Sequence, residues 1–338
     1  MDAKSVLFRS GFYSLFRRVA PSRQLGILRY HAVCARDAGY ADPGICVTPA
    51  AFAEHVAYFA SNYSVLPLPD AADALRRGLS LPPNALAITF DDGYEDNLAA
   101  AEILARHGLS ATFYITAGCL AGGEPFWPSE LRSLMAGITG PELAVSAAGV
   151  DLRLAVATPA EKRTAVARLT KTFKAHPVPV REALRERLRE ASTTAGAASP
   201  MLNWDQVRRM HALGMVIGSH TMTHPNLPNA GLDRARVEIV ESKARLEAET
   251  GAPVTMFSYP NGGAERYMTR EVAALVREAG FAAATTSRNA FAGRSSDLFA
   301  LERVQVSQEL ERVVFALEVE RYAFKPKPRP GELAEGVR

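Results

Sequence analysis

The sequence predicts an α/β fold that is built on a parallel sheet, either open or closed into a barrel. Two observations carry this prediction: apolar strands alternate with helices along the chain, and most of these helices end at a glycine. A chain of 338 residues, of which 48% are hydrophobic, is also long enough to bury the core that such a fold requires.

The alternation is clearest in two stretches of the chain. In the first, an apolar strand at 86–90 is followed by a helix at 96–107, by Gly108 and by a strand at 111–116. The second stretch has helices at 204–213, 232–250 and 269–279, and strands at 215–218, 254–259, 281–285 and 301–306. Repeated units of this kind are typical of parallel sheets, whose neighbouring strands are joined through helices.

The alternation breaks between residues 121 and 200, where we predict a mainly helical insertion. Charged helical stretches cover 161–172 and 180–191, and a linker of small residues covers 192–200. The chain therefore divides into a basic amphipathic segment at 1–24, a domain at 25–320 that holds the insertion at about 121–200, and a flexible tail at 321–338.

The balance of charges excludes a nucleic-acid partner. The chain mixes 39 basic with 36 acidic residues for a net charge of +3, whereas nucleic-acid binders concentrate their basic residues. Three cysteines, Cys34, Cys46 and Cys119, lack the Cys-x-x-Cys spacing of a metal site, so we expect reduced, structural thiols.

The first 24 residues mix apolar with basic side chains. They lack the apolar core of a secretory signal, and no part of the chain has the ~20 apolar residues that span a bilayer. We therefore expect a cytoplasmic protein that can also lie at the inner membrane surface. The segment either forms a basic amphipathic helix on an anionic membrane or packs on the domain as a terminal helix.

Two motifs with metal-binding side chains follow predicted strands. The segment TFDDG contains Asp91 and Asp92. The segment SHTMTH contains His220 and His224. Because reacting groups of parallel α/β folds lie at the carboxyl ends of strands, we expect both motifs at the same end of the sheet. On a helical turn, two histidines four residues apart point the same way and can bind one ion.

These residues suffice for a mononuclear metal hydrolase. A catalytic zinc uses three protein ligands and leaves one position open for water, and cobalt or nickel are the alternatives. If Asp92 joins His220 and His224 on the ion, Asp91 is left free. An ion lowers the pKa of a bound water from ~15.7 towards ~7, and a nearby carboxylate can take its proton as it attacks a carbonyl. The expected reaction is the hydrolysis of an amide or an ester. The chain has no Gly-x-Ser-x-Gly segment, so a serine hydrolase is disfavoured.

The two motifs and the segment FSYPNG at 257–262 resemble successive motifs of the polysaccharide deacetylase family, the NodB-homology domain of carbohydrate esterase family 4. The resemblance covers about 25–306, apart from the insertion. It implies an irregular (β/α)7 barrel and the removal of acetyl groups from N-acetylated sugars. It also implies that Asp91 is the general base, and that the metal ligands are Asp92, His220 and His224.

Two motifs depart from the common family pattern. In the third, Ser258 replaces an arginine that orients the catalytic acid, a variant that resembles bacterial exopolysaccharide deacetylases. The alignment places the backbone N–H of Asn261 towards the developing oxyanion, and Tyr259 is either a pocket or a core residue. In the last motif Arg303 replaces a histidine that acts as general acid. Since arginine cannot donate a proton at neutral pH, Arg303 either orients Asp91 or forms a surface ion pair.

Two further residues have open roles. His31, in the segment YHAV, resembles part of a Tyr-His-x-Val motif near the start of such enzymes, and is either a pocket residue, the general acid or a structural histidine. Trp127, in the segment FWP, either stacks on a sugar ring or anchors the inserted helices.

The sequence thus predicts a metal-dependent hydrolase that removes N-acetyl groups from the sugars of a polysaccharide or glycan intermediate. Its expected partner is the N-acetylated carbohydrate. One alternative is the same chemistry on a non-sugar amide or cyclic imide, and another is a carbohydrate-binding protein with impaired catalysis.

Overall fold

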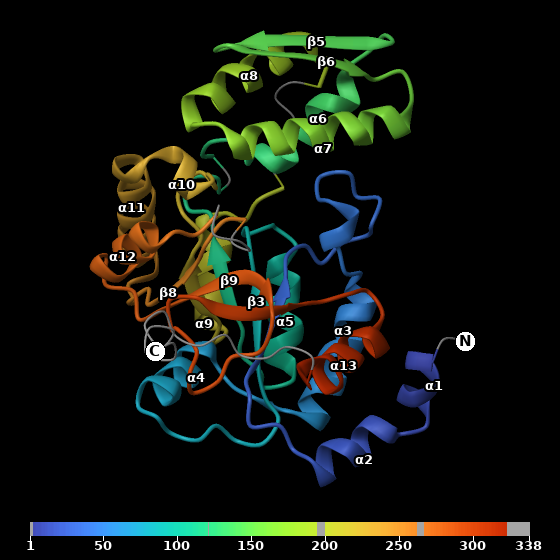
Figure 1. Ribbon diagram of the computed structural model, residues 1–338, viewed down its shortest axis with the longest axis vertical. Helices are drawn as coiled ribbons and strands as arrows, with labels where there is room; N and C mark the ends of the chain where they lie inside the picture. Colours follow the sequence, from blue (N-terminus) through green and yellow to red (C-terminus); the bar gives the residue numbers. More distant parts are fainter. Residues whose placement is uncertain (1–2, 121, 195–199, 262–266, 323–338) are drawn as a thin grey trace, which may run out of the picture.

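The computed structural model describes residues 3–120, 122–194, 200–261 and 267–322. Seven parallel strands close into a barrel that helices surround, and a second unit lies at one end of it (Figure 1). The predicted (β/α)7 barrel with a mainly helical insertion is therefore confirmed as the fold class.

The barrel closes at β1 (Gly26–Tyr30), which pairs with β3 (Ala85–Phe90) on one side and with β10 (Leu301–Gln305) on the other. The ring continues from β3 through β4 (Thr112–Ile115), β7 (Val216–Ser219), β8 (Met256–Ser258) and β9 (Ala283–Asn289) to β10. A short strand, β2 (Ser64–Val65), pairs with the first two residues of β3. Since the strands of the ring are parallel, their carboxyl ends meet at one end of the barrel.

The helices around the barrel bury one apolar face each. The four helices predicted at 96–107, 204–213, 232–250 and 269–279 are confirmed to within one residue at either end. Gly108 and Gly251 end two of them with φ of 67° and 66°, the left-handed backbone that favours glycine at a helix C-terminus. The helices outside the insertion are α1 (Ala3–Arg9), α2 (Phe12–Val19), α3 (Pro49–Asn62), α4 (Leu68–Arg76), α5 (Asn97–Arg106), α9 (Trp204–Ala212), α10 (Leu227–Ala230), α11 (Leu232–Thr250), α12 (Arg270–Glu278) and α13 (Leu310–Glu318), with 3-10 turns η1 (Pro43–Ile45) and η2 (Glu320–Tyr322).

The chain between β4 and β7 forms a second unit, which we call the inserted module (Figure 1). Its elements are α6 (Trp127–Gly137), the antiparallel strands β5 (Glu142–Ala147) and β6 (Val150–Ala155), α7 (Pro159–Ala175) and α8 (Val178–Ala191). Its apolar side chains make a cluster separate from the barrel core. The hairpin was not predicted, because the alternation of buried and exposed residues in β5 covers only six residues.

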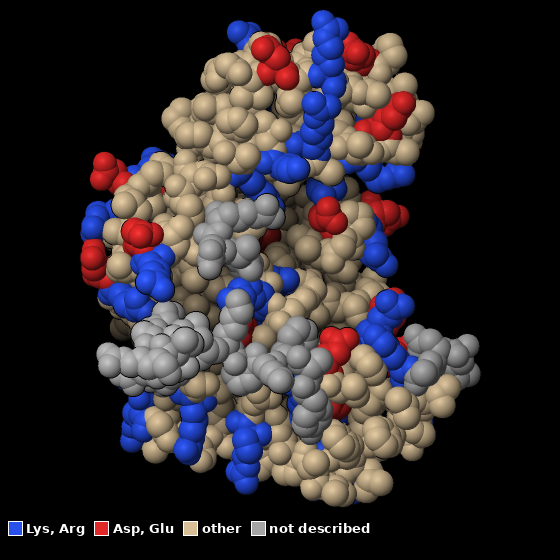
Figure 2. All heavy atoms as spheres, in the orientation of Figure 1, with Lys and Arg blue, Asp and Glu red and all other residues tan. Residues whose placement is uncertain are grey.

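The other expectations concern the ends and the surface. Residues 195–199 of the predicted linker and 323–338 of the predicted tail lie outside the described residues. All three cysteines are free and buried. In the described part of the chain, no helix is both long and apolar enough to cross a membrane. Lysines and arginines are interspersed with acidic residues over the face shown in Figure 2.

Candidate metal centre

Three buried side chains converge at the carboxyl ends of β3 and β7. The ligand atoms of Asp92, His220 and His224 all lie within 4.8 Å of one another. Asp92 Oδ1 is 3.5 Å from Nε2 of His220 and 3.4 Å from Nε2 of His224. His220 donates its Nδ1–H to the carbonyl of Ser258 at 2.7 Å, which leaves Nε2 with a lone pair towards the cluster. Two imidazoles and one carboxylate, so oriented, fit a divalent metal ion.

A strained loop, and not the predicted helical turn, brings the two histidines together. The backbone from His220 to His224 is irregular, with φ of 70° at Thr221 and 54° at His224. Asp92, which faces them, has a φ of 80°. A β-branched residue such as Thr221 is rarely found at positive φ, so surrounding contacts must hold it there. A helical turn would bond its N–H groups internally, whereas this loop presents them to another side chain.

That side chain is Glu238 of α11, which is fully buried. Its Oε2 accepts hydrogen bonds from the backbone N–H groups of Met222 at 2.9 Å and Thr223 at 2.8 Å, and its Oε1 accepts from Thr223 Oγ1 at 2.7 Å. Sequence reasoning missed this residue. The available signal is its position on the buried face of α11, between Ala235 and Ile239.

Asp91 is clamped by Arg303, which reaches it from β10. The guanidinium donates from NH1 to Asp91 Oδ1 and from NH2 to Asp91 Oδ2, both at 2.7 Å, in the paired geometry that makes the strongest ion pairs. Arg303 is fully buried, so the surface ion pair considered above does not occur. Further bonds run from its Nε to the carbonyl of Thr286 at 2.7 Å and from NH1 to Thr89 Oγ1 at 3.2 Å.

Arg303 is the main group that favours the ionised form of Asp91. Burial by itself raises the pKa of the Asp91 carboxyl, but the charge and hydrogen bonds of Arg303, together with His220 and His31, outweigh it and hold the pKa well below its usual range. Ser258 links the two parts of the site, since its hydroxyl lies 3.1 Å from Arg303 NH2 while its carbonyl holds His220.

His31 lies at the end of β1, beside Asp91. Its Nε2 is 3.8 Å from Asp91 Oδ2, and its buried Nδ1 has no hydrogen-bond partner among the described residues. Burial lowers the pKa of His31 to about 4, although Asp92 and Asp91 oppose this shift. The imidazole is therefore uncharged at neutral pH.

The residues that follow β8 have different environments. Asn261 has a φ of 61°, and its side-chain nitrogen is buried without a hydrogen-bond partner in the part of the chain that the structure describes. Tyr259 is 1% exposed, packs against Phe257 and donates its hydroxyl to the carbonyl of Phe299 at 2.9 Å. Tyr259 is thus a core residue and not a pocket residue.

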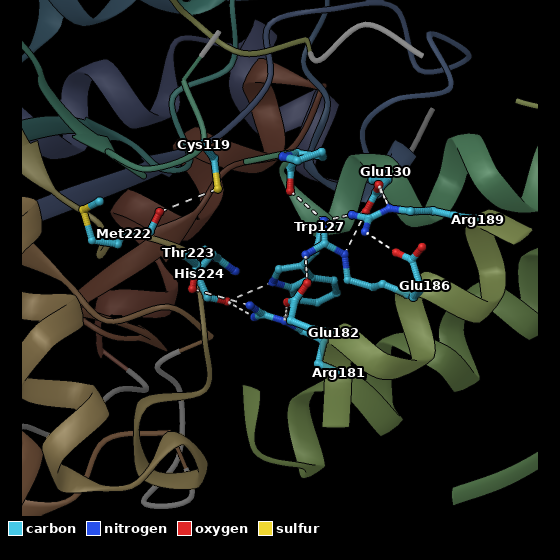
Figure 3. A network of polar contacts seen from close by, with 12 residues as sticks. Cys119, Trp127, Glu130, Arg181, Glu182, Glu186, Arg189, Met222, Thr223 and His224 are labelled. Carbon is cyan, nitrogen blue, oxygen red and sulfur yellow. Dashed lines mark hydrogen bonds and ion pairs between the residues drawn. The ribbon is translucent and has the colours of Figure 1, made fainter. Parts of the chain in front are cut away.

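The inserted module contacts the metal-ligand loop directly (Figure 3). Trp127 is 2% exposed and donates its Nε1–H to the carbonyl of His224 at 2.9 Å. Arg181 lies near the same carbonyl, with its NH1 at 3.5 Å, and its NH2 is 3.4 Å from Thr223 Oγ1. Trp127 is therefore a buried anchor of the module, with no face free to stack on a sugar.

A partly buried ion network stabilises this junction from the side of the module. Glu130 of α6 accepts a hydrogen bond from Arg189 of α8 at 2.7 Å (Figure 3). It also accepts one from Arg185 of the same helix. Arg185 also bonds Glu182 at 2.6 Å, and Glu182 bonds Arg181 at 2.9 Å. The charges that surround Trp127 are thus paired with one another.

In a comparison with protein families, residues 159–284 match the family described as polysaccharide deacetylase. The matched segment includes His220 and His224, while Asp91 and Asp92 precede it. No curated protein sequence matches the chain.

Solved deacetylase structures share the fold. The Streptococcus pyogenes deacetylase PplD, solved in complex with acetate, aligns with a TM-score of 0.58 at 17% identity over 88% of this chain and 99% of its own. IcaB from Ammonifex degensii aligns with a TM-score of 0.56 at 18% identity over 88% of this chain and 99% of its own. The BpsB deacetylase domain from Bordetella bronchiseptica aligns with a TM-score of 0.51 at 15% identity over 84% of this chain and 96% of its own.

The chain therefore has a segment that matches the polysaccharide deacetylase family, within a barrel that has the fold of the solved polysaccharide deacetylases.

Proposed function

We propose that this protein is a metal-dependent hydrolase that removes N-acetyl groups from the sugars of a polysaccharide or glycan intermediate. The observation that carries the proposal is a buried, ionised carboxylate, Asp91, beside a separate set of three metal-binding side chains. A scaffold that only binds carbohydrate has no use for a second buried carboxylate beside these three side chains.

The candidate ligand set supports zinc as the proposed ion. Asp92, His220 and His224 would hold one divalent ion, and their two nitrogens and one oxygen suit zinc. A bound ion supplies Lewis acidity, which makes a water more nucleophilic and a carbonyl more electrophilic. The burial of all three side chains would keep competing water away from the ion.

Asp91 is proposed to take the proton of the attacking water. Each of its oxygens accepts one hydrogen bond from Arg303 and has a second lone pair left. Arg303 therefore orients the carboxylate and still leaves each oxygen able to accept a proton. Arg303 is a positioning residue in this scheme, since it acts through Asp91. The orientation and the ionised state of the Asp91 carboxylate are then both fixed before a substrate binds.

The remaining roles concern the leaving amine and the oxyanion. The proton that Asp91 gains must reach the sugar nitrogen, and His31, with Nε2 3.8 Å from Asp91 Oδ2, is the candidate that passes it on. The backbone N–H of Asn261, held at positive φ after β8, is the candidate donor to the oxyanion. The acetate in the PplD complex is the product that this reaction would release.

The decisive experiment measures acetate release from N-acetylhexosamine oligomers. We expect turnover by the wild type, and a rate about 10²- to 10⁴-fold lower in Asp91→Asn at unchanged metal content. Chelation should abolish activity, and added zinc should restore it. Activity that survives in Asp91→Asn or after chelation would reject this mechanism.

Two other outcomes distinguish the alternatives. A zinc-loaded protein that binds the oligomers but releases no acetate would be a carbohydrate-binding protein with impaired catalysis. A protein that hydrolyses simple amides or cyclic imides, but none of the N-acetylated sugars, would have the proposed chemistry on a non-sugar substrate.

A further inference from the structure

The N-terminal helix α2 (Phe12–Val19) has its apolar face towards solvent. Phe12, Leu15 and Val19 are 45%, 64% and 76% exposed, and they lie at positions three and four residues apart on one side of the helix. Phe16 completes this stripe and stacks on Phe12 with ring centroids 5.9 Å apart. A surface helix normally buries such a stripe against the core, so the orientation of α2 is reversed. We call these four residues the α2 stripe.

The opposite face of α2 explains the reversal. Arg17 is 3% exposed, and its guanidinium lies 3.2 Å from Glu318 Oε1, whose residue is fully buried on α13. The same guanidinium bonds Tyr58 at 2.9 Å and Asn62 at 2.8 Å on α3. Turning the stripe inward would separate these buried charges, which is strongly unfavourable. The contacts of Arg17 therefore hold α2 in place with its apolar stripe towards solvent, before any partner binds.

The charges around the α2 stripe are of one sign. Residues 3–24 contain five basic and no acidic residues. Arg9, Arg18 and Arg23 are exposed, and none of them has an ion-pair partner in the described part of the chain. On the neighbouring helix α1, Val6 adds another exposed apolar side chain at 51%. The face shown in Figure 2 has mostly uncharged atoms at the corner where α2 lies, as expected for an apolar stripe that faces solvent.

The geometry points to an anionic lipid surface as the partner of this face, with the α2 stripe inserted among the acyl chains and the arginines on the headgroups. An apolar stripe flanked by basic residues is the composition of helices that lie in a membrane interface. A second copy of the chain fits less well, because a twofold contact through this face would bring the arginines of the two copies together.

The position of α2 sets the orientation of the bound protein. α2 immediately precedes β1, so it lies near the amino ends of the barrel strands, whereas the metal-binding residues lie at the carboxyl ends. In Figure 1 it lies at the end of the molecule away from the inserted module. A protein bound through the α2 stripe would present its metal-binding end away from the bilayer.

Sedimentation with lipid vesicles tests the proposal on the full chain. We expect binding to vesicles of phosphatidylglycerol mixed with phosphatidylcholine, little binding to phosphatidylcholine alone, and weakening by salt. Leu15→Ser with Val19→Ser should weaken binding at least about tenfold, and Arg18→Glu should weaken it about fivefold. Leu79→Ser, which removes a 46% exposed leucine elsewhere, is the matched control and should bind as the wild type does.

Three outcomes would overturn the proposal. Absence of binding to the anionic vesicles is the first, and binding that the Leu15→Ser, Val19→Ser protein retains is the second. The third is a dimer in solution that dissociates in this variant, because a second copy would then cover the stripe. None of these positions belongs to the metal-binding end, so acetate release from soluble oligomers tests the proposed function separately.

Discussion

Asp91 and the two histidines of the candidate metal centre lie in one site but are positioned by buried charges of opposite sign. Asp91 is held through its own carboxylate oxygens by the guanidinium of Arg303. The loop that carries His220 and His224 is held through its backbone N–H groups by the carboxylate of Glu238.

The difference follows from what each group has to do. A metal ligand must keep its lone pair free, so the protein fixes the loop, and no donor among the described residues bonds the Nε2 atoms of His220 and His224. A base must remain charged in a buried place, so the protein pairs the charge itself. The Asp91–Arg303 pair and the histidine loop held by Glu238 are the two halves of the site, and a mutation in one should leave the other intact.

The largest effect is expected from Arg303→Met. This change leaves Asp91 buried without a counter-charge, which should cost about 3–5 kcal/mol of unfolding free energy and raise the pKa of the carboxyl. The rate of acetate release should fall about 10²- to 10⁴-fold, while zinc content measured by mass spectrometry stays at the wild-type level.

Arg303→Lys refines this test, because it keeps the charge but loses the paired geometry, and it should fold and recover only part of the rate. Arg288→Met, which breaks a partly exposed ion pair with Glu302, is the control and should leave rate and stability nearly unchanged. Loss of zinc from Arg303→Met would show that the halves are not independent.

Glu238→Gln should give the converse result. The amide would place a donor where one carboxylate oxygen now accepts, opposite either Thr223 Oγ1 or the backbone N–H groups of Met222 and Thr223. The strained loop then loses an acceptor, and zinc affinity should fall about 10- to 100-fold. Competition with a chelator measures this affinity. At saturating zinc most of the rate should return, and Glu241→Gln, at an exposed position of the same helix, should match the wild type. A rate that stays low at saturating zinc would contradict positioning through the loop alone.

His31→Gln is expected to lower the rate at neutral pH about tenfold and to change the acid side of the pH profile. Because burial lowers the pKa of His31 to about 4, the wild-type imidazole is neutral above that pH and becomes charged below it. The wild-type rate should therefore fall as the pH drops through about 4, and this step should be absent in the variant. An identical pH–rate profile for both proteins would remove His31 from the mechanism.

The smallest effect should come from Trp127→Phe. The change removes one hydrogen bond to the carbonyl of His224 and keeps an aromatic ring against Phe173, so unfolding free energy should fall by about 0.5–1.5 kcal/mol. Zinc affinity should weaken a few-fold. Trp204→Phe is the control on the only other tryptophan. If Trp127→Phe binds zinc as tightly as the wild type does, Trp127 anchors the module and has no influence on the metal centre.

The local part of the site was predictable from the sequence. Asp91, Asp92, His220 and His224 stand in short motifs directly after strands, and the carboxyl ends of parallel strands share one end of the barrel. The buried ends of β3 and β7 could therefore be located without knowledge of the rest of the chain.

The parts that escaped prediction depend on distant contacts. Arg303 had two open interpretations, since its burial arises only when β10 closes the barrel 212 residues after Asp91. A glutamate such as Glu238, on a helix rich in charges, is usually solvated, and only the buried face of α11 distinguishes it. The apolar pattern of α2 indicated an amphipathic helix, but its outward orientation depends on Glu318, 301 residues away from Arg17.

The closure of the barrel between β1 and β10 also has a consequence for biosynthesis. A nascent chain that ends before Leu301 leaves the β10 side of β1 as an unpaired edge and Asp91 without its guanidinium. The long loop that this closure forms makes it a slow, late step, as in other folds of high contact order. Asp91 thus gains its ion pair last, and a chain truncated before β10 should be both inactive and prone to aggregate.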